Sequence, residues 1–293
     1  MGEQLALAAA LHDPIMPYTR IRDIDVFHEE HGSGPTLLFI HGLGSSTEDW
    51  EAQVPFFSDR YRVVTYDVRG HGRTSRPRHA YSLKQFSDDA AALIEQLGDA
   101  PVHVVGLSMG GMIAFQLAAD RPDLVRTLTI VNSGPEMVLR TFAQKFAIFQ
   151  RRWIVQMMGL RKWGAVLADR LLPGDEFVGL RAKIVERWAR NDKRSYLRAL
   201  RALVGWTVTA RLPGITQPTL ILTADMDYTP IPWKQHYTSL IPDARMVVIP
   251  DTRHFLPLER PELFNRAVDE FLTASASIPQ ASVTANARAG VTR

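Results

Sequence analysis

The chain has 293 residues, of which 46% are hydrophobic and 22% charged, a composition typical of one large folded domain or of a domain carrying an insert. It contains no cysteine, which excludes disulfides, thiolate metal sites and cysteine nucleophiles and suits a reducing compartment. No run approaches the roughly 20 apolar residues of a membrane span, and residues 1–4 lack the positive charge that opens a signal peptide. We therefore expect a cytoplasmic protein.

Charge is segregated along the chain. Residues 140–211 contain 16 Lys/Arg against 5 Asp/Glu, whereas the remainder contains 18 against 26. Such segregation indicates two units with different roles. Helices with solvated basic faces account for the excess more simply than a nucleic-acid site does, so no nucleic-acid partner is expected.

Short apolar runs alternate with helical patterns along most of the chain. The alternating stretch 21–30 predicts an early antiparallel strand that ends in a turn at 32–35. Six later runs are short and largely apolar, as in parallel strands buried on both faces: 36–40, 62–66, 102–105, 127–131, 219–223 and 245–249. Ser82 and Gln85 form a capping-box pattern ahead of apolar residues at helical spacing. This alternation predicts an α/β fold, a mostly parallel sheet with helices on both faces.

The alternation stops between residues 135 and 212. No strand-like run occurs there, and four aromatic residues recur at helical spacing: Phe142, Phe146, Phe149 and Trp153. We predict a helical cap inserted into the sheet domain, with its aromatic side chains packed in a core or, in part, lining a pocket beneath the cap. The predicted organisation is an extension (1–20), a core in two parts (21–134 and 213–274), the cap (135–212) and a disordered tail (275–293).

The stretch GLSMGG places Ser108 between a strand run and a helical run. Gly106 and Gly110 leave room for the sharp turn of a nucleophile elbow, in which a serine stands exposed at the end of a strand. The following helix would direct N–H groups and its positive dipole end at the reacting centre. Taken alone, the motif could also be a chance grouping of small residues in a turn.

A serine nucleophile needs a general base, and nine histidines compete for that role. His254 follows the last strand run, in a loop that can return to the edge of the sheet, and is our candidate. His71 lies in a glycine-rich turn and His103 within a strand run, so we assign them to turn geometry and to the core. Five others have surface-like settings: His12, His28, His31, His79 and His236.

The base needs a carboxylate that orients it and stabilises the imidazolium. The loop ADMDYTP after the run 219–223 offers Asp225 and Asp227. Asp227 lies farther into the loop, from where its side chain can reach a histidine. The order Ser108, Asp227, His254 is the order expected for this sheet architecture. Asp225 stays open as the alternative.

An oxyanion hole needs two donors aimed at the developing negative charge. The backbone N–H of Met109, directly after the nucleophile, is one candidate. The other is the N–H of Leu43 in the loop HGLGSS, where His41 and Gly42 support the turn.

Together these motifs resemble the α/β-hydrolase fold superfamily, specifically its serine esterase and lactonase-like members with a helical cap. Five stretches within residues 21–274 carry the resemblance: HGLG (41–44), DVRGHGRTS (67–75), GLSMGG (106–111), ADMDYTP (224–230) and HFLPLERPELF (254–264). The resemblance implies Asp227 as the acid, because the spacing of the family's G-x-x-D loop is kept although Ala224 replaces the glycine. It also implies that Asp67 is structural. Ser108 excludes the dehalogenases and epoxide hydrolases of this fold, which use an aspartate at the elbow.

The resemblance implies a serine hydrolase that cleaves a carboxylic ester or lactone through an acyl-enzyme. No metal or organic cofactor is expected. The substrate is expected to be a small apolar molecule, and the basic cap suggests an acidic group on it as an option. The same triad supports C–C bond hydrolysis, perhydrolysis, thioester cleavage and lyase reactions. A ligand-sensing receptor and a membrane-surface lipase are weaker alternatives, so no membrane partner is expected; a homo-oligomer is left open.

Overall fold

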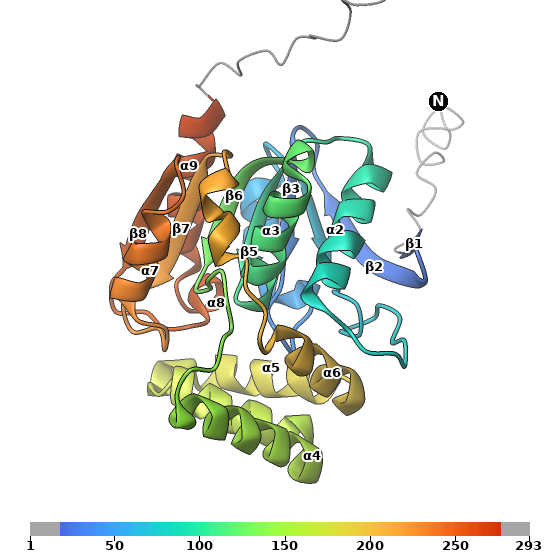
Figure 1. Cartoon of the computed structure of the whole chain (residues 1–293), viewed down its shortest axis with the longest axis vertical. Helices are drawn as coiled ribbons and strands as arrows, with labels where there is room; N and C mark the ends of the chain where they lie inside the picture. The colour runs from blue at the N-terminus through green and yellow to red at the C-terminus, as the bar shows by residue number, and fades with distance from the viewer. Residues whose placement is uncertain (1–17, 277–293) are drawn as a thin grey trace, which may run out of the picture.

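The computed structural model describes residues 18–276, which form an eight-stranded sheet flanked by helices (Figure 1). The strand order is β1-β2-β4-β3-β5-β6-β7-β8. β1 and β2 run antiparallel, and the six strands β3 to β8 pair in parallel. The strands are β1 (Tyr18–Ile21), β2 (Ile24–His31), β3 (Thr36–Ile40), β4 (Arg62–Tyr66), β5 (Val102–Leu107), β6 (Val125–Val131), β7 (Thr219–Ala224) and β8 (Ala244–Ile249). The predicted fold class is confirmed.

The N-terminal strand β1 is the one strand that the sequence patterns missed. It overlaps the predicted extension and pairs with β2 through a tight turn at Arg22, whose φ of 55° lies in the left-handed region. The rest of the predicted extension, residues 1–17, and the predicted tail beyond Ala276 lie outside the described residues.

Helices cover both faces of the sheet because each strand sends alternate side chains to opposite faces. In β3, Leu38 and Ile40 join one core cluster, and Leu37 and Phe39 join the other. The first cluster is covered by α2 (Leu83–Leu97), α3 (Met109–Asp120) and α7 (Ile231–Thr238), and the second by α1 (Gln53–Phe57) and α9 (Pro261–Ala276). The Ser82 side chain accepts a hydrogen bond from the Gln85 N–H, so α2 begins where predicted.

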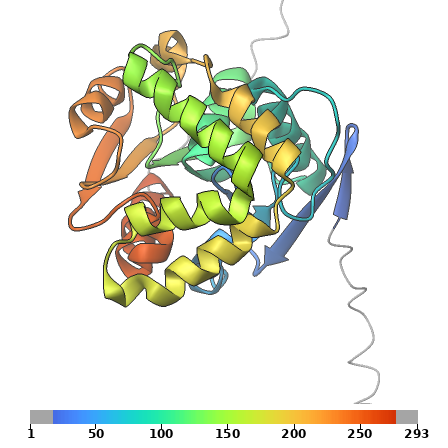
Figure 2. The ribbon, with the colours of Figure 1, turned by 90° about the horizontal axis from the view of Figure 1, so that it is seen from below.

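Three helices follow β6 and lie together at one end of the sheet (Figures 1 and 2). They are α4 (Phe142–Leu171), kinked at Gly159, α5 (Val178–Ala189) and α6 (Lys193–Leu203). Short helical turns complete the structure: η1 (Thr47–Trp50), η2 (Pro122–Leu124), η3 (Asp175–Phe177), η4 (Thr209–Gly214) and α8 (Leu256–Glu259). None of the helices in residues 18–276 has the length and apolar character of a membrane span.

The aromatic residues of α4 do not occupy the places predicted for them. Phe142 is 83% exposed, and Phe146, Phe149 and Trp153 are exposed as well. The face of α4 that packs inward carries Val155 instead. The prediction that these rings pack in a core was therefore wrong, because helical spacing identifies a face but not the side to which it turns. Of the pocket-lining prediction, Phe149 does line a hollow, but one between α4 and α6.

The helical region contacts the sheet domain at the loop after β3. The rings of Trp188 and Tyr196 lie so close to Gly44 that an added Cβ would meet them at 3.2 and 3.0 Å. Asn191 Nδ2 donates to the Gly44 carbonyl at 2.8 Å, and Arg187 forms an ion pair with Glu51 at 2.7 Å. These contacts fix the first turn of α6 and the end of α5 beside the loop that contains Leu43.

Candidate active site

The turn between β5 and α3 holds Ser108 in a strained conformation, with φ of 54° and ψ of −113°. Such a backbone is rare for residues other than glycine. A Cβ added at Gly106 would lie 2.3 Å from the Gly110 carbonyl oxygen, and one added at Gly110 would lie 2.0 Å from the Ile40 carbonyl oxygen. Both flanking positions therefore admit only glycine, as a nucleophile elbow requires.

The two predicted oxyanion donors lie on either side of this elbow. Met109 is the first residue of α3, where a helix leaves its N–H groups without intrahelical acceptors. Leu43 follows Gly42, at which an added Cβ would lie 3.6 Å from the Ser108 Cβ. Neither the Leu43 nor the Met109 N–H donates a hydrogen bond within residues 18–276. Both N–H groups are therefore unpaired donors in the described part of the chain.

His41 holds the loop that carries Leu43. Its Nε2 accepts a hydrogen bond from the Val68 N–H at 2.9 Å, so its Nδ1 carries the proton and donates to the Gly42 carbonyl at 2.7 Å. Burial lowers the pKa of His41 to about 4, and the ring is neutral at pH 7. The His41 ring thus joins the Gly42 carbonyl to the Val68 N–H and holds these two loops together.

The structure places Asp227 against His254. His254 Nδ1 donates to Asp227 Oδ1 at 2.7 Å, and the carboxylate is fully buried. Its Oδ2 accepts from Lys234 Nζ at 2.6 Å and from the Thr229 hydroxyl. Burial alone would raise the pKa of Asp227, but the charges and hydrogen bonds of His254 and Lys234 outweigh it and hold the pKa well below its usual range. Asp227 is therefore ionised and oriented to stabilise a protonated His254.

The alternative acid, Asp225, lies elsewhere. It is exposed, and its Oδ1 accepts a hydrogen bond from the Thr252 N–H at 3.2 Å. It makes no contact with His254 in the described part of the chain, so its position suits the bracing of a loop.

Asn132, directly after β6, fixes the loop of the candidate base and was not singled out from the sequence. Its Nδ2 donates to the carbonyls of Arg253 and His254, each at 3.0 Å, and its Oδ1 accepts from the Ala224 N–H at 2.9 Å. The signal that could have found it is a polar residue at the carboxyl end of a buried strand, where the loops of a parallel sheet converge.

A phenol lies against the candidate base, and it too was missed. The Tyr228 hydroxyl lies 3.1 Å from His254 Nε2, and the two rings are 4.3 Å apart. Residues 18–276 contain no direct hydrogen bond between Ser108 and His254. The three predicted triad residues thus lie at the same edge of the sheet, where Asp227 and Tyr228 are both hydrogen-bonded to His254.

Three other histidines bear on the assignment of the base. His71 and His103 are buried, beside the Arg69 carbonyl and the Thr127 hydroxyl respectively, where they fill the turn and the core as predicted. His28 is also buried, within 2.7 Å of the Thr19 hydroxyl, so the prediction of a surface setting was wrong. Its alternating strand turns this residue toward β1, which the patterns had not revealed.

Asp67 is fully buried and braces two loops next to the site. Its carboxylate accepts hydrogen bonds from the backbone N–H groups of Thr47 and Arg73 at 2.8 and 2.7 Å. These contacts suit a structural role. Across residues 18–276, no three His, Asp or Glu side chains are grouped so as to hold a metal ion.

Comparison with known proteins agrees with this geometry. A family model of the alpha/beta hydrolase fold matches residues 35–261. A Caulobacter vibrioides protein with the provisional name carbamate hydrolase RutD is 30% identical, covering 86% of this chain and 97% of its own. 3-Oxoadipate enol-lactonase 2 of Acinetobacter baylyi is 28% identical, covering 80% and 87%. A thermophilic esterase structure from Thermogutta terrifontis has a TM-score of 0.80 and 25% identity, covering 88% and 98%. The chain therefore belongs to the alpha/beta hydrolase fold family, and it is a hydrolase.

Proposed function

We propose that the protein hydrolyses a carboxylic ester or lactone through an acyl-enzyme formed on Ser108. The observation that carries this proposal is the hydrogen-bonded Asp227–His254 pair beside the strained elbow of Ser108. Two unpaired N–H groups, of Leu43 and Met109, supply the second requirement of acyl transfer, a site for the oxyanion.

The reaction follows from the roles of these groups. Ser108 Oγ attacks the carbonyl carbon while His254 Nε2 takes its proton, and the oxyanion is bound by the Leu43 and Met109 N–H groups. Asp227 stabilises the imidazolium, which then protonates the leaving alkoxide as the acyl-enzyme forms. Water attacks the acyl-enzyme and gives a proton to His254. That proton returns to Ser108 as the carboxylic acid leaves.

The first step requires His254 Nε2 to face the Ser108 hydroxyl. In the structure that nitrogen faces the Tyr228 hydroxyl instead. We propose that a bound substrate displaces the phenol and lets the serine contact the histidine directly. Catalytic hydrogen bonds are commonly long or misaligned before substrate binds, so this arrangement is compatible with the proposed mechanism.

A carbamate is the second candidate substrate, and the Caulobacter vibrioides relative favours it. The same serine can attack the carbamate carbonyl. The carbonyl carbon carries a nitrogen as well as an oxygen substituent, so either the amine or the alcohol can leave. The enol-lactonase and the esterase among the similar proteins favour C–O cleavage. We place the ester or lactone first because the names of two similar proteins, the enol-lactonase and the esterase, both refer to cleavage of an acyl C–O bond.

The test is turnover of p-nitrophenyl esters from acetate to palmitate, of an enol-lactone and of an alkyl carbamate. The wild type is compared with Ser108→Ala and with Ser33→Ala, an exposed serine as control. We expect Ser108→Ala to lose at least about 10³-fold in kcat, with an unchanged circular dichroism spectrum, and Ser33→Ala to match the wild type.

The outcomes separate the alternatives. Serine-dependent ester or lactone turnover supports the proposal and the best chain length sizes the acyl site. Serine-dependent turnover of the carbamate alone would assign the second candidate. An alanine variant that retains near wild-type turnover contradicts the mechanism, and a single slow turnover would identify a ligand-sensing protein.

A further inference from the structure

An exposed row of apolar side chains runs along the outer side of α4. Figure 2 shows this helix, coloured yellow-green, nearest to the viewer and outside the other two helices of the region. The row continues for four turns at helical spacing, through Phe142, Phe146, Phe149, Trp153 and Met157. The first three rings lie against one another, with centroids 6.2 and 6.4 Å apart. Large exposed apolar patches of this kind mark interaction sites.

Unpaired cations border this row. Lys145 and Arg152 of α4 and Arg194 and Arg201 of α6 are exposed, and none of them forms an ion pair or a side-chain hydrogen bond within residues 18–276. Aspartate and glutamate are absent from all but the last three residues of α4 (142–168) and from the whole of α6 (193–203). The positive charge here is therefore not neutralised by the protein itself.

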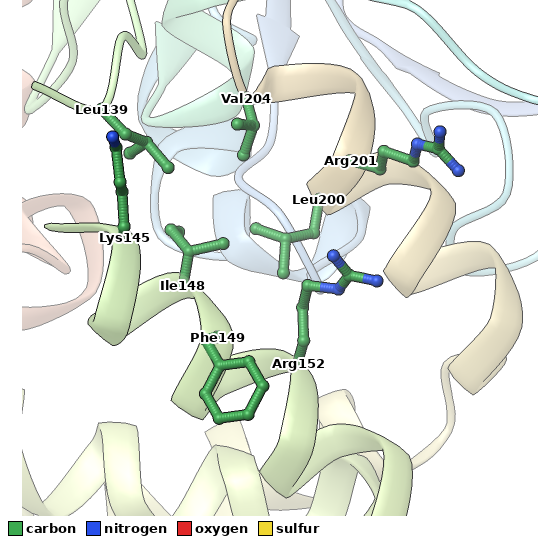
Figure 3. A pocket seen from close by; sticks show the side chains of 8 residues that line it. All are labelled: Leu139, Lys145, Ile148, Phe149, Arg152, Leu200, Arg201 and Val204. Atoms are coloured by element: carbon green, nitrogen blue, oxygen red, sulfur yellow. The ribbon is translucent and has the colours of Figure 1, made fainter. Parts of the chain in front are cut away.

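A hollow of about 440 Å³ lies where α4 and α6 meet, at the edge of the same row. Figure 3 shows its apolar side chains together with three cationic ones, which come from both helices. The apolar members are Leu139, Ile148, Phe149, Leu200 and Val204, and the cationic members are Lys145, Arg152 and Arg201. The hollow combines an apolar lining with positive charge, which suits a molecule that has an apolar chain and an anionic head.

We propose that this basic-aromatic face, the exposed row of α4 with the cations of α4 and α6 beside it, docks on an anionic lipid bilayer. Phenylalanine and tryptophan favour the boundary between headgroups and acyl chains, and lysine and arginine bind anionic headgroups. The hollow takes up one lipid at this boundary. The absence of carboxylates from these helix segments matches a negatively charged surface.

A second copy of the chain fits this face poorly. In a symmetric dimer the same patch appears on both sides, so the basic borders would oppose each other. Like charges brought together at an interface are repulsive. The apolar row alone could pair with itself, but the cations of Lys145, Arg152 and Arg201 could not.

Docking here would leave the candidate catalytic residues untouched, because none of them belongs to the face. It does depart from the expectation that no membrane partner exists. That expectation arose because the sequence does not reveal that Phe142 and its neighbours turn outward.

Vesicle flotation tests the proposal with the full chain. The probes are vesicles of phosphatidylcholine alone and of phosphatidylcholine with 30% phosphatidylglycerol. We expect the wild type to float with the anionic vesicles and not with the neutral ones, and to be released by high salt. Two variants remove the two features of the face: Lys145→Glu/Arg152→Glu/Arg201→Glu and Phe146→Ser/Phe149→Ser/Trp153→Ser.

The charge variant is expected to lower the partition coefficient by at least about hundredfold, since each of the three basic residues near the surface contributes about fivefold and the new carboxylates are repelled by the anionic headgroups. The matched control changes the same net charge at three exposed arginines on other elements: Arg78→Glu/Arg126→Glu/Arg266→Glu. It is expected to bind at least tenfold better than the charge variant. Each face variant is expected to keep its turnover of a soluble ester, which shows that it is folded. Ser108→Ala is expected to lose that turnover but to bind vesicles as the wild type does.

Three results would overturn the proposal. One is a wild type that fails to float with anionic vesicles, and another is equal binding by the control and the charge variant. The third is self-association in light scattering that Phe146→Ser/Phe149→Ser/Trp153→Ser abolishes, with no vesicle binding by the wild type, which would assign the face to a second copy of the chain.

Discussion

Tyr228 is the residue whose position decides how the proposed reaction begins. Its hydroxyl occupies His254 Nε2, the nitrogen that must accept the proton of Ser108. Desolvation of the hydroxyl and the charge of Asp227 raise the pKa of Tyr228, although its ring is partly open to solvent, so the phenol stays protonated at neutral pH. A protonated phenol can donate to Nε2 but cannot take the serine proton.

Tyr228→Phe is therefore expected to preserve kcat/KM for a soluble p-nitrophenyl ester or to raise it up to about fivefold. The physical reason is that a competing hydrogen bond to Nε2, worth about 1 kcal/mol, is removed. Tyr18→Phe, at an exposed ring on β1, serves as the control. A fall of a hundredfold or more would show instead that the phenol passes the proton from the serine to the histidine.

At this scale the sequence identifies the residues that short motifs surround and misses those defined by distant contacts. Ser108 lies within GLSMGG (106–111), a stretch whose glycines already predict the sharp turn. His254 could be chosen because it follows a strand run. Lys234, Asn132 and Tyr228 carry no such local pattern. Their roles depend on Asp227 and His254, which only the folded sheet brings beside them.

Among the elements, the contact between α5 and the segment after β3 buries the carboxyl of Asp49, which has a raised pKa. Asp49 in η1 is buried, and burial raises its pKa to about 6 although the Ser45 hydroxyl and Arg187, 3.8 Å away, both lower it. An unfolded aspartate has a pKa of about 3.9. The folded state therefore holds this proton more tightly than the unfolded state does.

The sign of the resulting pH dependence follows. Between pH 4 and 6 the unfolded state loses the Asp49 proton first, so this group lowers the free energy of unfolding as pH rises, by about 3 kcal/mol in total. Asp49→Asn removes the effect. We expect the variant to gain stability relative to the wild type from pH 4 to 6 and to show a constant difference above pH 6. Urea unfolding at four pH values measures this, with exposed Asp175→Asn as the control; a difference that does not change with pH would contradict it.

Sequence patterns predict where the strands and helices lie but not which face of a helix is covered. Runs such as 36–40 and 62–66 match their strands because a strand buried on both faces is built largely of apolar residues. The helix that begins after Ser82 was marked by its cap. The orientation of α4 was not, because Phe142 and Val155 lie on opposite faces of it and both are apolar. Only packing against α5 and α6 selects which face is covered.

In the molecule as a whole, three histidines are buried and neutral at pH 7. Burial lowers the pKa of His41, His71 and His103 to about 4, 3 and 4. An unfolded histidine has a pKa of about 6.5. Below that pH the unfolded chain binds protons that the folded chain does not. Each of these groups therefore lowers the free energy of unfolding as pH falls, whereas Asp49 lowers it as pH rises.

His103 isolates this effect best, because His41 and His71 contact each other beside the oxyanion loop, whereas His103 pairs with Thr127 in the middle of the sheet. Its stabilisation is present at pH 7 and is lost as pH falls from 6.5 to 4, by about 3 kcal/mol. His103→Gln keeps a polar group for Thr127 and has no proton to gain. The free energy of unfolding of this variant, from urea titrations at pH 7, 6, 5 and 4.5, is expected to fall less steeply on acidification than that of the wild type. Exposed His79→Gln is the control and should parallel the wild type. If His103→Gln also runs parallel to the wild type, then folding does not lower the pKa of His103, and the prediction is contradicted.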